Sequence, residues 1–196
     1  MKILFIILLF LISGCATVKP SVAEYKIVTK SLDSLKSSIC KDRSLKIAQA
    51  FSPSSLNSLN MDYMDPSGKI FSYTQSQWQE SPTDAITLEL LKSIRSAEIF
   101  SSVETSRSRS KSSWILETNI EEFLQFYKED FKSSYVNIVI TISIVDSKTN
   151  GVVASKTFNS TVDTKTLDAQ GGVEAFDEAL SQILSQNIEW LGGICR

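Results

Sequence analysis

An alternation of apolar and polar residues dominates the C-terminal half of the chain. Between residues 136 and 145, an aliphatic side chain occupies every even position, which is the period of a β-strand with one buried face. Asn150-Gly151 follows as a hairpin turn, and residues 152–162 return as a second strand. Residues 114–127 also predict a strand. Together the three strands predict an antiparallel meander.

Two other segments have the spacing of helices. Ser81 can cap the first helix, and Pro82 suits its first turn. Apolar residues at helical spacing follow. Gly171-Gly172 is predicted to break the chain, and a long final helix then has one apolar side between Val173 and Leu191.

Shorter apolar stretches complete the fold. They predict strands at 25–29 and 45–51, a hairpin of 61–64 and 70–73 around the turn 65–68, and a strand at 103–105. Residues 31–43 predict a loop. The basic, serine-rich stretch 107–113 predicts either a solvated loop, which we favour, or a contact with anionic lipid head groups. The order of elements predicts an α+β domain with a mostly antiparallel sheet and two helices packed on one face.

The N-terminus has the pattern of an export signal. Lys2 precedes ten consecutive apolar residues, which are too few to span a bilayer but typical of a signal peptide. The run closes with Leu11-Ile12-Ser13-Gly14-Cys15, which resembles the lipobox of bacterial lipoproteins. The alternative is an ordinary signal with a chance cysteine. We expect a signal peptide at 1–14, a lipidated tether at 15–23 and a single domain at 24–196.

Lipidation of Cys15 predicts attachment to a membrane, because several acyl chains on one residue anchor a protein stably. Ala16, rather than aspartate, follows the cysteine. In enterobacteria that pattern favours the outer membrane, so we expect the periplasmic face of that membrane. Cys40 and Cys195 then remain as an even pair in a compartment that permits disulfides. They predict an internal bridge, and the alternatives are two free thiols or pairing with another protein.

Composition narrows the function. The chain has 196 residues, of which 42% are hydrophobic and 21% charged, as expected for one ordinary globular domain. A net charge of −2 gives no basic excess for nucleic acid. The chain contains no histidine, which excludes Ser-His-Asp and Cys-His sites and His-ligated metals. Glu121 and Glu122 are neighbours on a strand, so we expect them on opposite faces. We therefore expect no enzyme activity, no cofactor and no metal.

The aromatic residues suggest a binding surface instead. Phe123, Phe126, Tyr127 and Phe131 are too close together for all of them to face one core. Trp78 lies just before the first helix, where it either staples the helix start or packs in the core. The candidate partner or lipid surface therefore comprises Trp78, Phe123, Phe126 and Tyr127.

Several of these segments resemble one family. Trp78-Gln79-Glu80-Ser81-Pro82, a helix and then Phe100 to Val103 resemble the "W-x-[DE]-x-P … F-x-x-V" core of the ABC-type transport auxiliary lipoproteins, the PqiC-like family. The strand from Trp114 to Phe123 resembles the family's "L-x-[LTV]-x-[IV]-x-x-F". The chain departs from the family at 53–56, where "P-x-Y-L" is absent, and at 61–73, where a hairpin replaces an arginine-rich strand.

The resemblance implies a non-catalytic accessory role. Such lipoproteins work with an MCE-domain protein and an ABC transporter that move phospholipids or other hydrophobic molecules across the envelope. The lipoprotein would dock the MCE assembly at the outer membrane, and a homo-oligomer would match its symmetric partner. The alternative is a structural or assembly lipoprotein of another outer-membrane machine.

Overall fold

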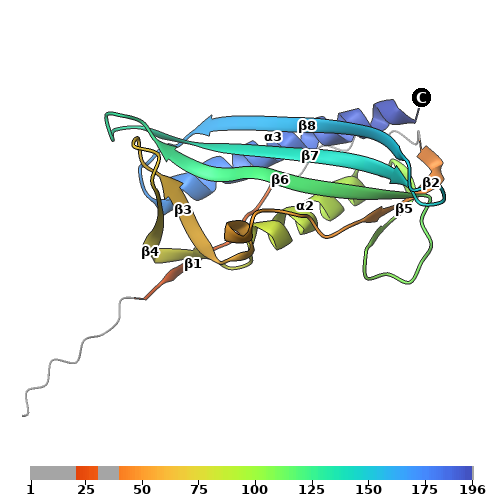
Figure 1. Cartoon of the computed structure of the whole chain (residues 1–196), viewed down its shortest axis with the longest axis horizontal. Helices are drawn as coiled ribbons and strands as arrows, with labels where there is room; N and C mark the ends of the chain where they lie inside the picture. The colour runs from red at the N-terminus through yellow and green to blue at the C-terminus, as the bar shows by residue number, and fades with distance from the viewer. Residues whose placement is uncertain (1–20, 31–39, 196) are drawn as a thin grey trace, which may run out of the picture.

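The computed structural model describes residues 21–30 and 40–195, and these form an α+β domain with one eight-stranded sheet and two α-helices (Figure 1). In chain order the elements are β1 (Ala23–Tyr25), β2 (Cys40–Ile47), the 3-10 helix η1 (Ser54–Asn57), β3 (Asn60–Met64), β4 (Ile70–Trp78), α2 (Pro82–Ser96), β5 (Phe100–Thr105), β6 (Trp114–Tyr127), β7 (Ser134–Asp146), β8 (Val152–Asp163) and α3 (Ala169–Ile194). The predicted fold class is confirmed.

The meander formed by β6, β7 and β8 contains the longest strands of the sheet, and β8 forms one of its edges. β7 pairs antiparallel with β6 from Trp114↔Asp146 to Tyr127↔Ser134, and β8 pairs antiparallel with the other edge of β7. Every second residue of β7 is buried, from Ser134 to Ile144. The alternation in the sequence therefore predicted both the strand and its buried face.

Two short strands share the second edge of β6. β2 pairs with the start of β6 at Leu45↔Trp114, and β3 pairs with its end at Met64↔Phe126. Both pairings are parallel, and η1 takes up the extra chain between them. The strand predicted at 45–51 is thus shifted to Cys40–Ile47. Residues 40–43, predicted as loop, belong to it, while 31–39 lie outside the described residues.

The two helices cover one face of the sheet, as predicted (Figure 1). Ser81 caps α2 by accepting a hydrogen bond from the Asp84 N–H at 3.2 Å, and Pro82 occupies the first turn. Leu90 and Ile94 of α2 and Leu180 and Leu184 of α3 are at most 1% exposed. Apolar burial between these helices and the meander supplies the core.

The predicted break at Gly171-Gly172 is wrong, because both glycines lie inside α3. Asp168 caps this helix by accepting from the Gly171 N–H at 2.9 Å. A Cβ on Gly171 would overlap the backbone oxygen of Thr166, and a Cβ on Gly172 would overlap Oε1 of Gln125. The glycines therefore permit a close approach of the helix start to its neighbours, at some cost in helix propensity.

The strand predicted at 25–29 is also shorter than expected. Only residues Ala23–Tyr25 pair with β4, and the following backbone bonds to helix side chains instead. The Val28 N–H donates to Asp177 Oδ1 at 2.9 Å, and the Lys30 N–H donates to Ser181 Oγ at 3.0 Å. These side chains of α3 replace a neighbouring strand, so the segment leaves the sheet and lies along the helix.

We predict that Gly171→Ala lowers the free energy of unfolding by about 1–3 kcal/mol, because the added methyl group overlaps a backbone atom that cannot move aside freely. Gly193→Ala is the matched control in the same helix, where nothing lies within 4 Å of the new Cβ. That control should be neutral or slightly stabilising. Urea denaturation of both variants measures the difference, and equal effects would contradict the packing argument.

Candidate functional site

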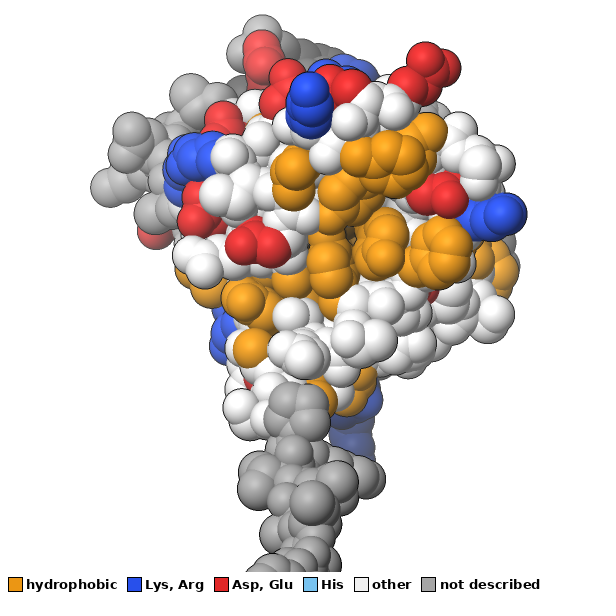
Figure 2. Space-filling view, turned by 90° about the vertical axis from the view of Figure 1, so that its left-hand side faces the viewer, with side chains coloured by type: hydrophobic (Ala, Val, Ile, Leu, Met, Phe, Trp, Pro, Cys, Tyr) orange, Lys and Arg blue, Asp and Glu red, His pale blue; other side chains and the backbone are white. Residues whose placement is uncertain are grey.

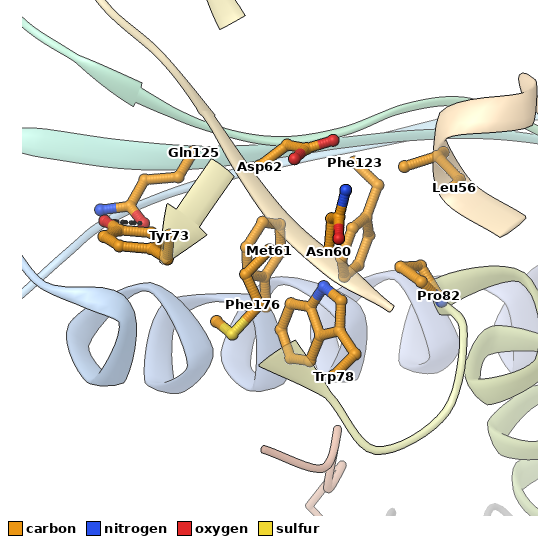
Figure 3. Close-up of a pocket in the computed structure, with 10 residues that line it drawn as sticks. All are labelled: Leu56, Asn60, Met61, Asp62, Tyr73, Trp78, Pro82, Phe123, Gln125 and Phe176. Atoms are coloured by element: carbon orange, nitrogen blue, oxygen red, sulfur yellow. Dashed lines mark hydrogen bonds between the residues drawn. The ribbon is translucent and has the colours of Figure 1, made fainter. Parts of the chain in front are cut away.

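Of the four residues predicted to form a partner or lipid surface, two are buried and two are partly exposed. Trp78 and Phe123 are only 2% and 5% exposed, so neither can contact a partner. Their rings pack on Phe176 of α3, with ring centroids 5.7 Å and 4.1 Å from it (Figure 3). The prediction that these two residues lie on a binding surface is therefore wrong. Trp78 packs in the core, which was the alternative for this residue. Phe126 and Tyr127 are partly exposed.

A β-bulge explains why the sequence pattern predicted the wrong face for some side chains of β6. The register between β6 and β7 shifts between Ile120 and Glu122. One extra residue of β6 therefore opposes β7, and the alternation of faces restarts after the bulge. Glu121 bonds to Thr141 at 2.5 Å and Glu122 bonds to Asn137. Both acceptors therefore lie on the face of the sheet that the helices leave open, and the prediction of opposite faces for the two glutamates is wrong.

The aromatic cluster leaves almost no internal space. The pocket between β3, β4 and α3 is lined by Met61, Trp78, Phe123 and Phe176 among others (Figure 3). It holds ≈ 10 Å³, about the room for one water molecule. An acyl chain needs far more room, so this pocket is a packed contact and cannot carry a lipid.

Above this cluster, a hydrogen-bond network fixes the β3–β4 hairpin to the end of the sheet. The Tyr73 hydroxyl donates to Oε1 of the buried Gln125 at 3.1 Å and lies 2.9 Å from the Tyr127 hydroxyl. Gln125 Nε2 donates to Ser134 Oγ at 3.0 Å, and the Tyr127 hydroxyl donates to the Leu167 carbonyl. Burial, with the neighbouring Tyr127, raises the pKa of Tyr73 above its ordinary value. The hairpin is therefore held rigidly.

Beyond the network, apolar side chains gather at one end of the molecule, which Figure 2 shows as a nearly continuous patch. Phe131, Ile70 and Phe71 are the most exposed, at 59%, 58% and 44%. We call this surface the apolar end and define it by residues of the β3–β4 hairpin and the β6–β7 turn: Met64, Ile70, Phe71, Phe126, Tyr127 and Phe131. Phe126 also stacks on Tyr135, with ring centroids 5.2 Å apart. The aromatic surplus in the sequence pointed to this surface, but it could not locate the hairpin residues.

A further exposed aromatic residue lies on the open face of the sheet. Phe51 is 73% exposed, while its backbone donates to the Thr118 carbonyl at 2.8 Å and accepts from the Ile120 N–H at 2.8 Å. Glu117 and Asn119 line the shallow depression beside its ring. Because β6 fixes its backbone, Phe51 is an apolar contact held in a fixed position beside polar side chains of the open face. No pattern in the sequence singled it out.

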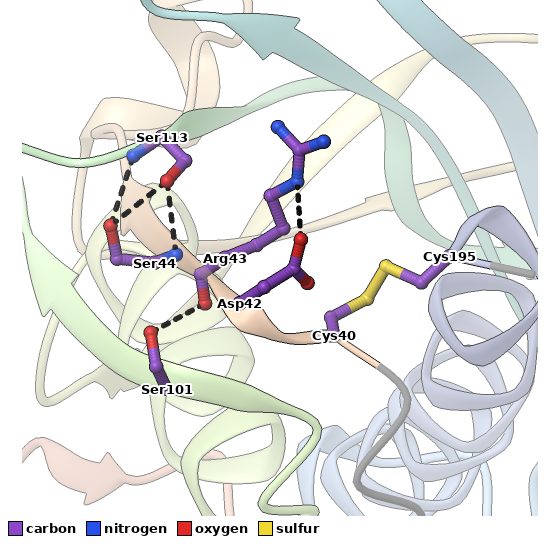
Figure 4. The surroundings of a disulfide bond; sticks show 7 residues. All are labelled: Cys40, Asp42, Arg43, Ser44, Ser101, Ser113 and Cys195. Carbon is purple, nitrogen blue, oxygen red and sulfur yellow. Dashed lines mark hydrogen bonds and ion pairs between the residues drawn. A yellow bond between two sulfur atoms is a disulfide. The ribbon is translucent and has the colours of Figure 1, made fainter.

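The two predicted cysteine sites differ in what the structure describes. Cys15 lies outside the described residues. Cys40 and Cys195 are joined in a disulfide with Cα atoms 5.5 Å apart (Figure 4). The bond links the start of β2 to the end of α3 across 155 residues. Serine contacts reinforce β2 nearby, because the Ser113 N–H donates to Ser44 Oγ at 2.9 Å and Ser101 Oγ donates to the Arg43 carbonyl at 2.7 Å.

Within residues 21–30 and 40–195, no cluster of His, Cys, Asp or Glu could hold a metal ion. In the same ranges, no helix has both the length and the apolar character that a bilayer crossing requires.

No protein-family model matches the chain, and no curated protein matches its sequence. Solved structures share its fold. The DUF330 protein XCC0632 from Xanthomonas campestris is 17% identical with a TM-score of 0.79, and the match covers 88% of this chain and 96% of that one. A second structure, of an uncharacterized protein, is 12% identical with a TM-score of 0.68 and covers 87% and 99%. The hypothetical protein CT253 from Chlamydia trachomatis is 6% identical with a TM-score of 0.53 and covers 78% and 97%.

These likenesses show a common architecture over almost the whole described chain. The fold therefore belongs to the class represented by the DUF330 protein. Identities this low leave the activity of the chain to be argued from its own residues.

We predict that mass spectrometry of the non-reduced protein finds a peptide of Cys40 linked to a peptide of Cys195. Closure of so long a loop stabilises the fold by about 5 kcal/mol at most through the entropy of the unfolded chain. Reduction should therefore lower the melting temperature markedly. Two thiols that react with an alkylating agent in the native protein would contradict the bond.

Asp177 should make stability depend on pH. Burial, assisted by the charges of Glu89 and Glu174 and opposed by the Val28 N–H, raises the pKa of Asp177 to about 6. The folded protein thus holds the proton more tightly than the unfolded chain, whose Asp has a pKa of about 4. This contribution to stability is complete below pH ~4 and is lost as the pH rises to about 6.

We predict that Asp177→Asn flattens the pH dependence of the unfolding free energy between pH ~4 and about 6 and makes the protein more stable than the parent above that range. The amide oxygen can still accept from Val28. Glu178→Gln is the matched control, because the Glu178 side chain is about half exposed and its carboxylate lies 3.9 Å from Lys30 Nζ. Denaturant titrations across this range should separate the two variants, and an unchanged slope in Asp177→Asn would refute the assignment.

Proposed function

We propose that this protein is a lipid-anchored, non-catalytic docking component of the bacterial cell envelope. It would connect an MCE-type ABC transport system for phospholipids or other hydrophobic molecules to the outer membrane. The observation that carries the proposal is the combination of a lipobox, Leu11 to Cys15, with a domain that has the fold of a DUF330 protein over 88% of this chain. The segments that resemble the auxiliary lipoproteins, from Trp78 to Val103 and from Trp114 to Phe123, contribute buried residues to the core of that fold.

The packing of the domain supports docking rather than carriage of a lipid. The aromatic pocket holds only ≈ 10 Å³, and Trp78, Phe123 and Phe176 fill its surroundings. The open face of the sheet offers a partner the exposed Phe51 beside the acidic side chain of Glu117. Rigid, exposed aromatic residues are typical anchors of protein interfaces. We therefore assign the open face to the protein partner.

A photo-crosslinking amino acid at position 51 of the full-length protein tests this proposal in intact cells. We expect it to capture an MCE-domain protein, identified by mass spectrometry after detergent extraction. The matched control carries the same probe at Val28, which is 60% exposed beside the helices. A third variant, Cys15→Ala, should lose both the acyl chains, seen as intact mass, and the crosslink, because the protein no longer reaches the membrane.

Three results would contradict the proposal. Equal capture at positions 28 and 51 would contradict the assignment of the open face to the protein partner. Unchanged mass and membrane extraction of Cys15→Ala would contradict lipidation of Cys15. Capture of outer-membrane assembly factors alone would favour the second candidate, a structural or assembly lipoprotein.

A further inference from the structure

We propose that the apolar end rests on the lipid bilayer that holds the anchor, with Phe131 and Ile70 in contact with the acyl boundary. This inference rests on the proposed lipid anchor at Cys15 and goes beyond it, because it fixes which end of the domain faces the membrane. Phe131 and Ile70 are 59% and 58% exposed. Neighbouring apolar side chains at the tip of one domain mark an interaction site rather than ordinary surface.

The connection of the chain to the domain places this end near the membrane. β1 is parallel to β4 and begins with Ala23 opposite Ser76, while β4 begins at Ile70 in the hairpin. The start of β1 is therefore about 20 Å along the strand from Ile70. β1 and the β3–β4 hairpin also lie in the same half of the molecule, on the side that Figure 2 views (Figure 1).

The tether is too short to hold the domain away from the bilayer. Ser21 follows Cys15 by six positions, and six peptide steps reach about 20 Å at most in any conformation. A lipidated Cys15 thus keeps Ser21 within about 20 Å of the membrane surface, and the start of β1, two residues further along, within about 27 Å. This end of the domain therefore stays close to lipid, and its exposed side chains include the apolar and aromatic Ile70, Phe71 and Phe131. Aromatic side chains favour the membrane interface.

The backbone at Phe131 supports a functional reason for the exposed ring. Phe131 has φ 51°, the left-handed region that glycine adopts easily and a bulky side chain does not. The ring is largely exposed and contributes little to the core, although its centroid lies 6.5 Å from that of Tyr127. A strained, exposed aromatic residue costs folding energy, and a contact outside the domain accounts for its presence.

The charges around the apolar end are mixed. Lys128 forms an ion pair with Asp163 at 3.0 Å, and Glu129 and Asp130 share the turn with Lys132. No net positive charge favours anionic lipid over zwitterionic lipid. The contact should therefore depend on apolar insertion and change little with salt.

Depth-dependent fluorescence quenching tests the orientation. The full-length lipidated protein with Lys132→Cys carries an environment-sensitive dye in vesicles of phosphatidylethanolamine and phosphatidylglycerol. The native disulfide leaves Cys40 and Cys195 unlabelled. We expect nitroxide-labelled lipids to quench this dye. They should not quench the same dye at Thr149→Cys, in the β7–β8 turn at the other end of β7, about 40 Å away. That turn also precedes exposed apolar residues, Val152 and Val153.

Phe131→Gly separates membrane contact from folding. Glycine relieves the left-handed backbone, so the fold should be unharmed or more stable. Loss of the ring should lower the equilibrium constant for lipid contact at position 132 by about tenfold, the effect of withdrawing one phenyl ring from an apolar environment. Retained melting temperature together with lost quenching would support the proposal.

Two outcomes would overturn the proposal, and they differ from failure of the anchor. A dye at position 132 that stays unquenched in vesicles without any other protein would overturn the proposal. That result would overturn it even if a protein partner shields the same position in cells. Equal quenching at 132 and 149 would also overturn it. Intact mass of the same preparation reports acylation of Cys15 separately. An acylated protein with an unquenched dye therefore refutes the orientation alone, and an unacylated protein refutes the anchor.

Discussion

Pairing of β6 on both edges is the constraint on which the rest of the structure depends. β7 occupies one edge over its whole length, whereas β2 and β3 divide the other edge between them. A single uninterrupted neighbour would have left no room for η1 or for the hairpin that follows it. Because β3 pairs only with the last residues of β6, just before the β6–β7 turn, the hairpin projects at the end where Phe126 and Tyr127 lie. Backbone pairing thus creates the exposed end of the domain.

The two ends of the domain therefore differ in the contacts that hold them and in the side chains that they expose. At one end, β2 is fixed between β5 and β6 and tied to α3 by Cys40 and Cys195. At the other end, the Gln125–Tyr73–Tyr127 network holds the hairpin from below and leaves its apolar side chains in solvent. Burial of Trp78 and Phe123 stabilises the fold, so the available binding surfaces are the apolar end and the open face. A rigid body with two such surfaces can bridge a membrane and a protein partner.

Sequence patterns predicted those parts of the fold in which local chemistry and tertiary packing agree. The alternation in β7, the cap at Ser81 and the Asp65–Gly68 turn all correspond to the structure. The predictions were wrong where a long-range contact determines the local structure. The bulge after Ile120 reversed the faces of Glu122 and Phe123, and the close approach of Gly172 to Gln125 turned an expected break into a helix start. Phe51 was missed because its exposure depends on the edge of β6.

We propose that this protein serves lipid transport between membranes rather than envelope structure in general. The most direct test of this role measures phospholipid exposed on the outer surface of cells that lack the gene, before and after complementation. We expect disturbed lipid asymmetry that the parent protein restores and that Phe51→Asp does not restore, although the variant is acylated and folded. Normal asymmetry in the deletion strain under envelope stress, with outer-membrane protein assembly disturbed instead, would refute the proposed transport role.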